Sequence, residues 1–398
     1  MNYKKIAAFL SAAAISVCLL ISCNKSTAKK GEMRDISSET LVSEMTLGWN
    51  LGDTLDVCAA DRDGDGKINE APAEGEEVDE TLWGNPKAIK KVFEKIKDDG
   101  FNSVRIPITW RDHLGKAPDY IISDNWMDRV EEVVNYAYSL DMYVIINVHH
   151  DGGGDPDFGA WIRNASYDYD GVIEKYKALW NQIADRFEDY SDRLIFESMN
   201  EVGFDDLRGP ENYEVLNKIN QEFVNLIRSS GGNNPKRHLL IAGYYTDITM
   251  TCSSDFKMPD DPENRCILSL HYYTPWQFCT TTQQRNWGTE AEVEEMKRLI
   301  TNMTDKFTDN GIPVIIGEYG TARGNDEPSR VYFSETFVKL CHENNIPAFL
   351  WDNGSELDRG SLKWQNPELP KALNRAVSDK NYTPVSYTHL RAHETLSD

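Results

Sequence analysis

The sequence lacks the short motifs that mark several large classes of enzyme. No Gly-x-Gly-x-x-Gly follows the first strand-like run and no phosphate-binding loop occurs, which argues against dinucleotide and nucleoside triphosphate chemistry. No Cys-x-x-Cys pair is present among the seven cysteines. Neither a zinc site of that type nor dithiol redox chemistry is therefore indicated.

Positive charge is scarce as well. The 398 residues contain 42 Lys and Arg against 65 Asp and Glu, a formal net charge of -23. Nucleic acids and anionic membrane surfaces are poor partners for so acidic a chain, whereas neutral polymers are not excluded. The sequence also lacks internal repeats and any linker that would separate a second domain. Its length suits one large barrel or two ordinary domains.

Long apolar runs are absent except at the N-terminus. Residues 1–22 begin with two lysines and continue as a short apolar core, the pattern of a signal peptide. The ending at Ser22-Cys23 resembles a bacterial lipobox, which predicts lipidation of Cys23 and a polar tether over 23–40. We expect an exported bacterial lipoprotein, at the outer membrane and cell surface or in the periplasm, that meets the membrane only through this anchor. A simple secretion signal is the alternative.

The last residues, 385–398, do not look like part of the natural protein. The run from Val385 to Thr395 resembles the translation of a transposase adapter used in sequencing libraries. We interpret this segment as an assembly artefact. No metal site is inferred from His389 and His393, although two histidines four residues apart would otherwise suggest one.

Between the tether and this tail, apolar strand-like runs alternate with amphipathic helix-like segments. The predicted strands cover 46–50, 101–107, 142–149, 193–200, 237–243, 266–271, 312–317 and 346–351. The predicted helices cover 86–99, 124–140, 170–190, 212–230, 290–309, 329–344 and 367–378. Eight such units favour the α/β class, a (β/α)8 TIM barrel formed by a single domain over 41–380. An open doubly wound sheet is the alternative.

Two of the predicted strands end in glutamate. The apolar run from Leu194 leads into Asn200-Glu201, and the run from Ile312 leads into Gly317-Glu318. A carboxylate at the carboxyl end of a buried parallel strand is badly placed for packing and well placed for chemistry. Either glutamate alone could be a solvated loop residue. Two on one rim suggest the carboxylate pair used in glycoside hydrolysis.

Most of the other strands also lead into polar or aromatic residues. These are Asn50 after the first strand, Arg105 within the second, His149 and His150 after the third, His271 and Tyr273 after the sixth, and Trp351 and Asn353 after the eighth. Packing or surface pairing could explain each residue singly. So many on one rim are typical of a substrate cleft.

An acidic insertion over 58–79 contains half of a calcium-binding loop. Asp61, Asp63 and Asp65 stand at positions one, three and five of the loop, and Gly66 follows at position six. The twelfth position is Pro72 instead of the bidentate glutamate, so an intact EF-hand is not expected. The segment resembles the loop of a dockerin repeat. A structural calcium site and a solvated acidic loop both remain open.

The motifs together resemble glycoside hydrolase family 5, and within it the endoglucanase and xyloglucanase group called subfamily 4. The matching stretches are Gly48-Trp49-Asn50-Leu51-Gly52, Thr81-Leu82-Trp83-Gly84-Asn85-Pro86, 100–107, Asn147-Val148-His149-His150, 196–201, His271-Tyr272-Tyr273, Gly317-Glu318-Tyr319-Gly320 and Trp351-Asp352-Asn353-Gly354. The resemblance runs from about 45 to 376. Two departures are Asp53, where the family often has Asn, and Val202, where it usually has Pro.

The resemblance implies a (β/α)8 barrel and a retaining double displacement on a plant cell-wall β-1,4-glucan. Glu318 would be the nucleophile and Glu201 the acid/base. A positive neighbour should keep the nucleophile ionised, with Arg105 as the candidate. Burial should keep a proton on Glu201 near neutral pH. No cofactor is required, and a monomer is expected.

Supporting roles also follow from the resemblance. Asn200 would bond the sugar 2-hydroxyl, and Tyr273 would hold the nucleophile. Three histidines, His149, His150 and His271, would bond sugar hydroxyls or orient the acids. Trp351 would be a stacking floor for the sugar at the cleaved bond, with Asn50 and Asn353 in the same part of the cleft.

Three alternative functions differ from this one in the residues that they require. A mannanase or a xylanase on the same fold would differ in its sugar contacts, which the sequence does not show. A lipid-anchored glycan-binding protein on an inactive barrel could lose Glu201, Glu318 or Arg105, yet all three are present. An aldolase would need a phosphate site or a Schiff-base lysine at a strand end, and the sequence indicates neither.

Overall fold

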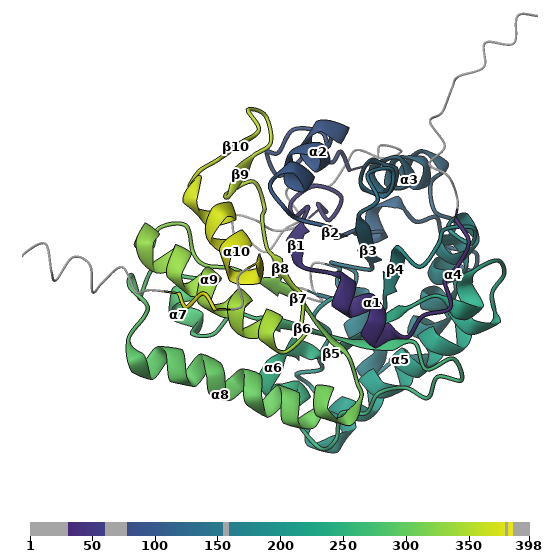
Figure 1. The fold of residues 1–398 in the computed structure, drawn as a ribbon. Coiled ribbons are helices and arrows are strands. Elements are labelled where there is room, and N and C mark those ends of the chain that lie inside the picture. The colour runs from purple at the N-terminus through teal and green to yellow at the C-terminus, as the bar shows by residue number, and fades with distance from the viewer. Residues whose placement is uncertain (1–30, 60–77, 154–158, 379–380, 385–398) are drawn as a thin grey trace, which may run out of the picture.

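The protein is described by a computed structural model over residues 31–59, 78–153, 159–378 and 381–384. Eight parallel strands form a closed barrel, in which consecutive strands pair and β8 pairs with β1 (Figure 1). They are β1 (Leu47–Asn50), β2 (Ser103–Ile106), β3 (Tyr143–Asn147), β4 (Leu194–Glu197), β5 (Leu239–Asp247), β6 (Cys266–Tyr272), β7 (Val314–Tyr319) and β8 (Ala348–Leu350). The predicted (β/α)8 barrel is confirmed, and the open sheet is wrong.

Helices cover the outside of the barrel (Figure 1). Those of eight residues or more are α2 (Lys90–Asp98), α3 (Asp124–Tyr138), α4 (Tyr169–Arg186), α5 (Pro210–Ser229), α8 (Glu290–Lys306), α9 (Glu327–Glu343) and α10 (Glu368–Ser378). The β5–β6 connection contains only the single turn α6 (Ile248–Thr251), which explains why the sequence showed no helical period there. Helix α7 (Trp276–Cys279) follows β6, and a short hairpin of β9 (Leu357–Asp358) and β10 (Lys363–Trp364) precedes α10.

Helix α1 (Ser38–Glu44) closes the end of the barrel at which the strands begin. Its Leu41 and Val42 pack against inward-facing strand residues such as Ile145 and Ile315. Just before it, Arg34 donates a hydrogen bond from Nε to Asp192 at 2.7 Å. The folded domain therefore begins before residue 41. The part of the predicted tether from Arg34 onward is therefore in contact with the barrel, through the Arg34–Asp192 bond and the packing of α1.

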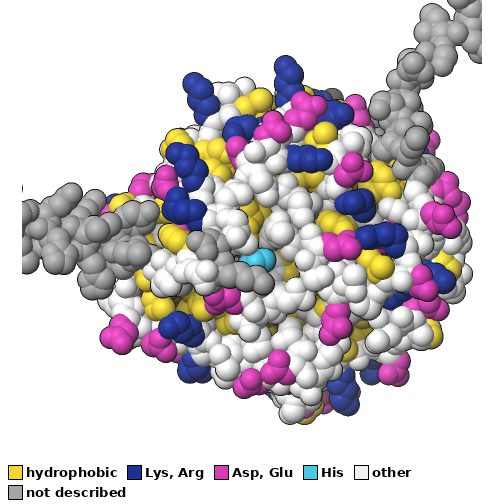
Figure 2. Space-filling model, viewed as in Figure 1, with side chains coloured by type: hydrophobic (Ala, Val, Ile, Leu, Met, Phe, Trp, Pro, Cys, Tyr) yellow, Lys and Arg dark blue, Asp and Glu magenta, His cyan; other side chains and the backbone are white. Residues whose placement is uncertain are grey.

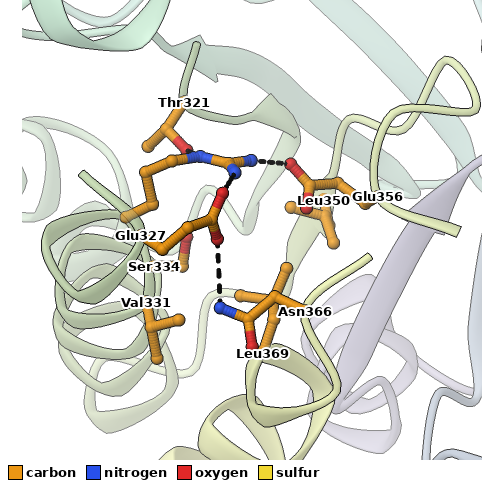
Figure 3. Close-up of a pocket in the computed structure, with 9 residues that line it drawn as sticks. Thr321, Glu327, Val331, Ser334, Leu350, Glu356, Asn366 and Leu369 are labelled. Carbon is orange, nitrogen blue, oxygen red and sulfur yellow. Dashed lines mark hydrogen bonds and ion pairs between the residues drawn. The ribbon is translucent and has the colours of Figure 1, made fainter. Parts of the chain in front are cut away.

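A cluster of ion pairs around the buried Arg330 side chain holds the segment that follows β8. Arg330 of α9 donates to Glu327 at 2.5 Å and also to Glu356, while Asn366 donates to Glu327 at 3.0 Å (Figure 3). Burial raises the pKa of Glu356 to about 7, against the opposing charge of Arg330. The cluster ties the chain after β8 to α9, and so supports Trp351 at the start of that segment.

Charged side chains of both signs are interspersed over the face shown in Figure 2. The net charge of -23 is therefore not gathered into a single acidic patch on that face. In the part of the chain that the structure describes, the helices include none with the length and apolarity needed to span a bilayer.

Several sequence predictions fall outside the described residues. They are the signal peptide of 1–22, lipidated Cys23, the calcium ligands Asp61, Asp63 and Asp65, and the adapter-like tail of 385–398. These stay predictions from the sequence.

Candidate active site

Arg105 lies at the centre of a buried hydrogen-bond network inside the barrel. Its Nε donates to Glu197 of β4 at 2.7 Å, and its Nη1 donates to Glu318 of β7 at 2.7 Å. The remaining donors reach Asn200 at 2.8 Å and Asn50 at 3.1 Å. Burial opposes the positive charge of Arg105, but the two carboxylates outweigh burial and raise its pKa. The guanidinium therefore stays cationic and holds four polar side chains in fixed positions.

Glu318 is held on both carboxylate oxygens. Oε1 accepts from Arg105, and Oε2 accepts the hydroxyl of Tyr273 at 2.9 Å. Its side chain is only 6 % exposed. Two directed donors and near-complete burial leave this carboxylate with one orientation, which is what an attacking nucleophile needs.

Glu201 follows β4 and is more open, with 39 % of its side chain exposed. Its backbone has a left-handed φ of 43°, which is unusual for a residue with a Cβ and marks a constrained position. The Oε1 atom lies 2.8 Å from Nδ1 of His271. Burial raises the pKa of Glu201, but hydrogen bonding to His271 and the nearby positive charge outweigh burial, so the pKa lies below its usual value. The expectation of a raised pKa is therefore wrong for the free protein.

The two glutamates lie close together across His271. One oxygen of each carboxylate and a ring nitrogen of His271 all lie within 4.8 Å of one another. Nδ1 of His271 is also 3.6 Å from Oε2 of Glu318. The structure therefore brings together the two residues that the sequence named at separate strand ends.

The described residues contain two groups with ligand atoms spaced as metal ligands are. One is Glu201, His271 and Glu318, and the other is Asp56, His149 and His150. A cation in the first group would have to displace the hydrogen bond between His271 and Glu201. Proton transfer fits that arrangement better than metal binding does.

Two tryptophans lie beside the histidines that follow β3. Trp351 lies parallel to the ring of His149, with centroids 5.9 Å apart and planes 7° apart. Trp83, from the loop before α2, lies 5.5 Å from the ring of His150. The sequence named Trp351 and both histidines. It gave Trp83 no role, although Trp83 stands in one of the quoted motifs.

One of two further predicted substrate contacts is placed differently, and the other stays a prediction. Asn50 is fully buried, with Nδ2 donating to the carbonyl of Gly317 at 2.9 Å, so it supports Arg105 and does not line the cleft. Asn353 is exposed, and its backbone carbonyl accepts from Asn85 at 3.0 Å. That bond ties the loop of Trp83 to the segment after β8.

Sequence reasoning missed Glu197. It is fully buried and accepts from Arg105 and from the hydroxyl of Ser269 at 2.7 Å. A glutamate inside an otherwise apolar strand was the available signal, because such a residue is almost never buried without a charged partner.

A cavity of about 620 Å³ adjoins Glu201. Besides Glu201 it is lined by Arg163, Asp205, Tyr245, Asp247, Met250, His271, Tyr273, Thr274 and Trp276. Trp276 is 62 % exposed, which is high for so large an apolar ring. A cavity with three aromatic side chains, Tyr245, Tyr273 and Trp276, and several polar groups is typical of a ligand site.

Tyr245 is fixed in this cavity by neighbouring loops. Its hydroxyl donates to Asp205 at 2.6 Å and accepts from Arg163 at 2.9 Å, and its backbone N–H donates to the carbonyl of Val202 at 2.9 Å. Tyr245 and Thr246 both have left-handed φ values, of 51° and 49°. The strained backbone turns the ring into the cavity at an irregularity in the β5–β6 pairing.

A closed (β/α)8 barrel that gathers two glutamates at the carboxyl ends of β4 and β7, beside an aromatic cleft, has the architecture of a glycoside hydrolase. Comparison with known families agrees. A family model described as cellulase (glycosyl hydrolase family 5) matches residues 67–357. The chain belongs to glycosyl hydrolase family 5.

Individual relatives support this assignment. The chain is 37% identical to endoglucanase B of Clostridium cellulovorans over 91% of its own length and 80% of that protein. It is 39% identical to cellulase/esterase CelE of Acetivibrio thermocellus over 87% of its length, but spans only 41% of CelE. A solved broad-specificity endoglucanase from Ruminococcus champanellensis with bound cellotriose is 36% identical, with a TM-score of 0.77, and the match covers 86% of this chain and 99% of that one.

Proposed function

We propose that the protein is a retaining endo-β-1,4-glucanase that cleaves plant cell-wall glucan by double displacement. The observation that carries this proposal is the approach of one oxygen of Glu201 and one of Glu318 to within 4.8 Å. Retaining enzymes need carboxyl groups about 5–5.5 Å apart, whereas inverting enzymes leave about 6.5–9.5 Å for a water molecule. The enclosed position of Glu318 supports its role as the nucleophile, and the more open position of Glu201 supports its role as the acid/base.

In the first step, an oxygen of Glu318 attacks the anomeric carbon while Glu201 gives a proton to the departing glycosidic oxygen. In the second step, Glu201 takes a proton from water, which attacks the same carbon and releases Glu318. Arg105 and Tyr273 hold Glu318 in line for attack. Asn200 accepts from Arg105 through its oxygen, so its amide N–H groups are left to donate to the sugar 2-hydroxyl.

Substrate binding raises the pKa of Glu201, which lies below its usual value in the free protein. A glucan lying across the cleft covers the exposed part of its side chain, and this loss of water disfavours the ionised carboxyl. Departure of negative charge from Glu318 during the first step then lowers the pKa of Glu201 again, so that it can act as a base.

The proposal is tested by the release of reducing ends from carboxymethylcellulose, barley β-glucan, xyloglucan and glucomannan. We expect oligosaccharides from at least one β-1,4-glucan, with the β-configuration of the new reducing end detected by NMR before mutarotation. The R. champanellensis relative is described as having broad specificity, so release from more than one polymer is expected. Binding to these polymers without cleavage would favour the glycan-binding alternative, and cleavage of the mannan-containing polymer alone would favour a mannanase.

We propose that the cavity beside Glu201 holds the part of the glucan that departs when the glycosidic bond is cleaved. The acid/base must lie next to the departing oxygen, and Glu201 lines this cavity together with Tyr245 and Trp276. A volume of about 620 Å³ is within the range of pockets that enclose drug-sized ligands. Sugar rings at this position would stack on the two aromatic side chains.

Tyr245→Ala should therefore impair cleavage selectively. We expect kcat/KM on cellopentaose to fall roughly 10-fold, the size of one lost aromatic contact. Hydrolysis of dinitrophenyl β-cellobioside should change little, because its leaving group is not a sugar. Tyr167→Ala is the matched control, since that tyrosine is 74 % exposed and does not line the cavity. Equal losses on both substrates would contradict the assignment of this cavity to the leaving group.

A further inference from the structure

His149 and His150 present two adjacent imidazoles to the cleft. Their rings are 4.6 Å apart with planes at 78°. Among the described residues no hydrogen bond reaches Nε2 of either ring, and neither Nε2 is a fully buried atom without a partner. Both Nε2 atoms therefore retain some access to solvent. What they can offer a sugar depends on which nitrogen of each ring carries a proton.

The orientation of the Asn147 side chain is fixed independently of either ring. Asn147 is the last residue of β3, and its Oδ1 accepts the backbone N–H of Ile108 at 3.0 Å. The amide nitrogen must then be the atom that faces His149. Nδ2 of Asn147 lies 3.1 Å from Nδ1 of His149, and an amide NH2 can only donate. Nδ1 of His149 is consequently an acceptor without a proton.

His149 is neutral in this environment. Burial lowers its pKa well below the usual value, and the positive charge of Arg105 acts in the same direction. One oxygen of Asp56 also lies within 4.8 Å of a ring nitrogen of His149. A neutral imidazole with an unprotonated Nδ1 carries its proton on Nε2. His149 therefore offers a donor to the cleft.

His150 has the opposite tautomer. Its Nδ1 lies 3.2 Å from the carbonyl oxygen of Gly153, which can only accept, so Nδ1 carries the proton. Burial lowers the pKa of His150, which leaves Nε2 bare. Adjacent rings thus offer one donor and one acceptor. A sugar hydroxyl both donates and accepts, and it matches this pair.

We propose that Asn147 is a positioning residue that holds His149 in its Nε2–H tautomer, so that His149 and His150 together present a donor and an acceptor to one glucan hydroxyl. The sugar contact rests on the proposed function, whereas the tautomer does not. The same tautomer argues against a metal site at Asp56, His149 and His150, because Nε2 of His149 would have to lose its proton to coordinate.

The test is Asn147→Asp, which changes the shape of the side chain very little. One carboxylate oxygen can still accept from Ile108, while the other replaces the NH2 group that faced Nδ1 of His149. Nδ1 must then carry a proton. At low pH His149 becomes doubly protonated and keeps its Nε2–H donor. As the pH rises, His149 loses the Nε2 proton and with it the donor, so kcat/KM should fall through an additional basic limb, besides the one that deprotonation of Glu201 gives the wild type.

A double variant separates this effect from structural damage. In a His149→Gln background, Asn147→Asp should add no new basic limb, because the ring that titrates is gone. A direct readout is the ¹⁵N NMR spectrum of the histidine side chains, with His149 assigned by its disappearance in His149→Gln. We expect a protonated Nε2 and an unprotonated Nδ1 in the wild type, and a protonated Nδ1 in Asn147→Asp.

Two results would overturn the proposal. One is a wild-type spectrum with the His149 proton on Nδ1. The other is an Asn147→Asp pH profile parallel to that of the wild type. The NMR measurement requires no catalytic activity. If the protein is inactive on every β-glucan, the proposed function is wrong, but the spectrum still shows which tautomer His149 adopts. If Asn147→Asp does not fold, the wild-type spectrum alone gives the answer.

Discussion

Glu318→Ala should lower kcat at least about 10⁴-fold on every substrate, equivalent to about 5.5 kcal/mol of transition-state stabilisation. The loss is large because no other carboxylate in the network can take its place. Glu197 is engaged by Arg105 and Ser269, and Glu201 is held by His271. Initial rates on dinitrophenyl β-cellobioside measure the loss, and circular dichroism with thermal unfolding checks that the fold is kept. Residual activity above about 1 % of wild type would contradict the assignment.

Azide distinguishes the two glutamates. In Glu318→Ala it should attack the substrate directly and give the α-glycosyl azide, because one displacement inverts the anomeric carbon. In Glu201→Ala the covalent intermediate still forms from a substrate with a good leaving group, so azide should give the β-glycosyl azide by a second displacement. The two variants are matched controls for each other. The same anomer from both would mean that the roles are assigned wrongly.

The positions of the catalytic candidates could be predicted because chain order and topology coincide in a parallel barrel. Each apolar run delivers the residue at its end to the same rim, so Glu201, Glu318 and His271 could be grouped without coordinates. The strand pattern alone was enough to identify Glu201 and Glu318 as a carboxylate pair. The distance between the two carboxylates and their unequal exposure could be learned only from the structure.

Other features depend on contacts that the strand pattern does not encode. Asn50 looked like a cleft residue because it ends β1, yet its amide turns inward to Gly317. Tyr245 gave no signal, because it enters the cavity through two left-handed residues at an irregularity in β5. The pKa of Glu201 depends on the balance between its burial and the hydrogen bond from His271, which lies 70 residues away in sequence. Arg34 joins the fold through Asp192, a pairing that no local pattern indicates.

Arg105→Met is the second variant with a large expected effect, because it combines a loss of stability with a loss of activity. It removes the cation that faces Glu197, whose side chain is fully buried, and Glu318, which is nearly so. Breaking a buried ion pair from one side costs about 3–5 kcal/mol, since the remaining carboxylate loses its partner in a poorly solvated site. The free energy of unfolding in urea measures this cost. An unchanged midpoint would mean that water already solvates the network.

The double variant Arg105→Met/Glu197→Gln separates the two consequences. Removing the orphaned charge at Glu197 should restore at least about 1–2 kcal/mol of the lost stability, because a neutral side chain needs no buried cation. Activity should not return, since Glu318 still lacks the donor on Oε1 that fixes its orientation and stabilises its charge. Recovery of both together would show that Arg105 acts only through the fold. Recovery of stability alone would show that Arg105 is needed at Glu318 itself, where the sequence placed it.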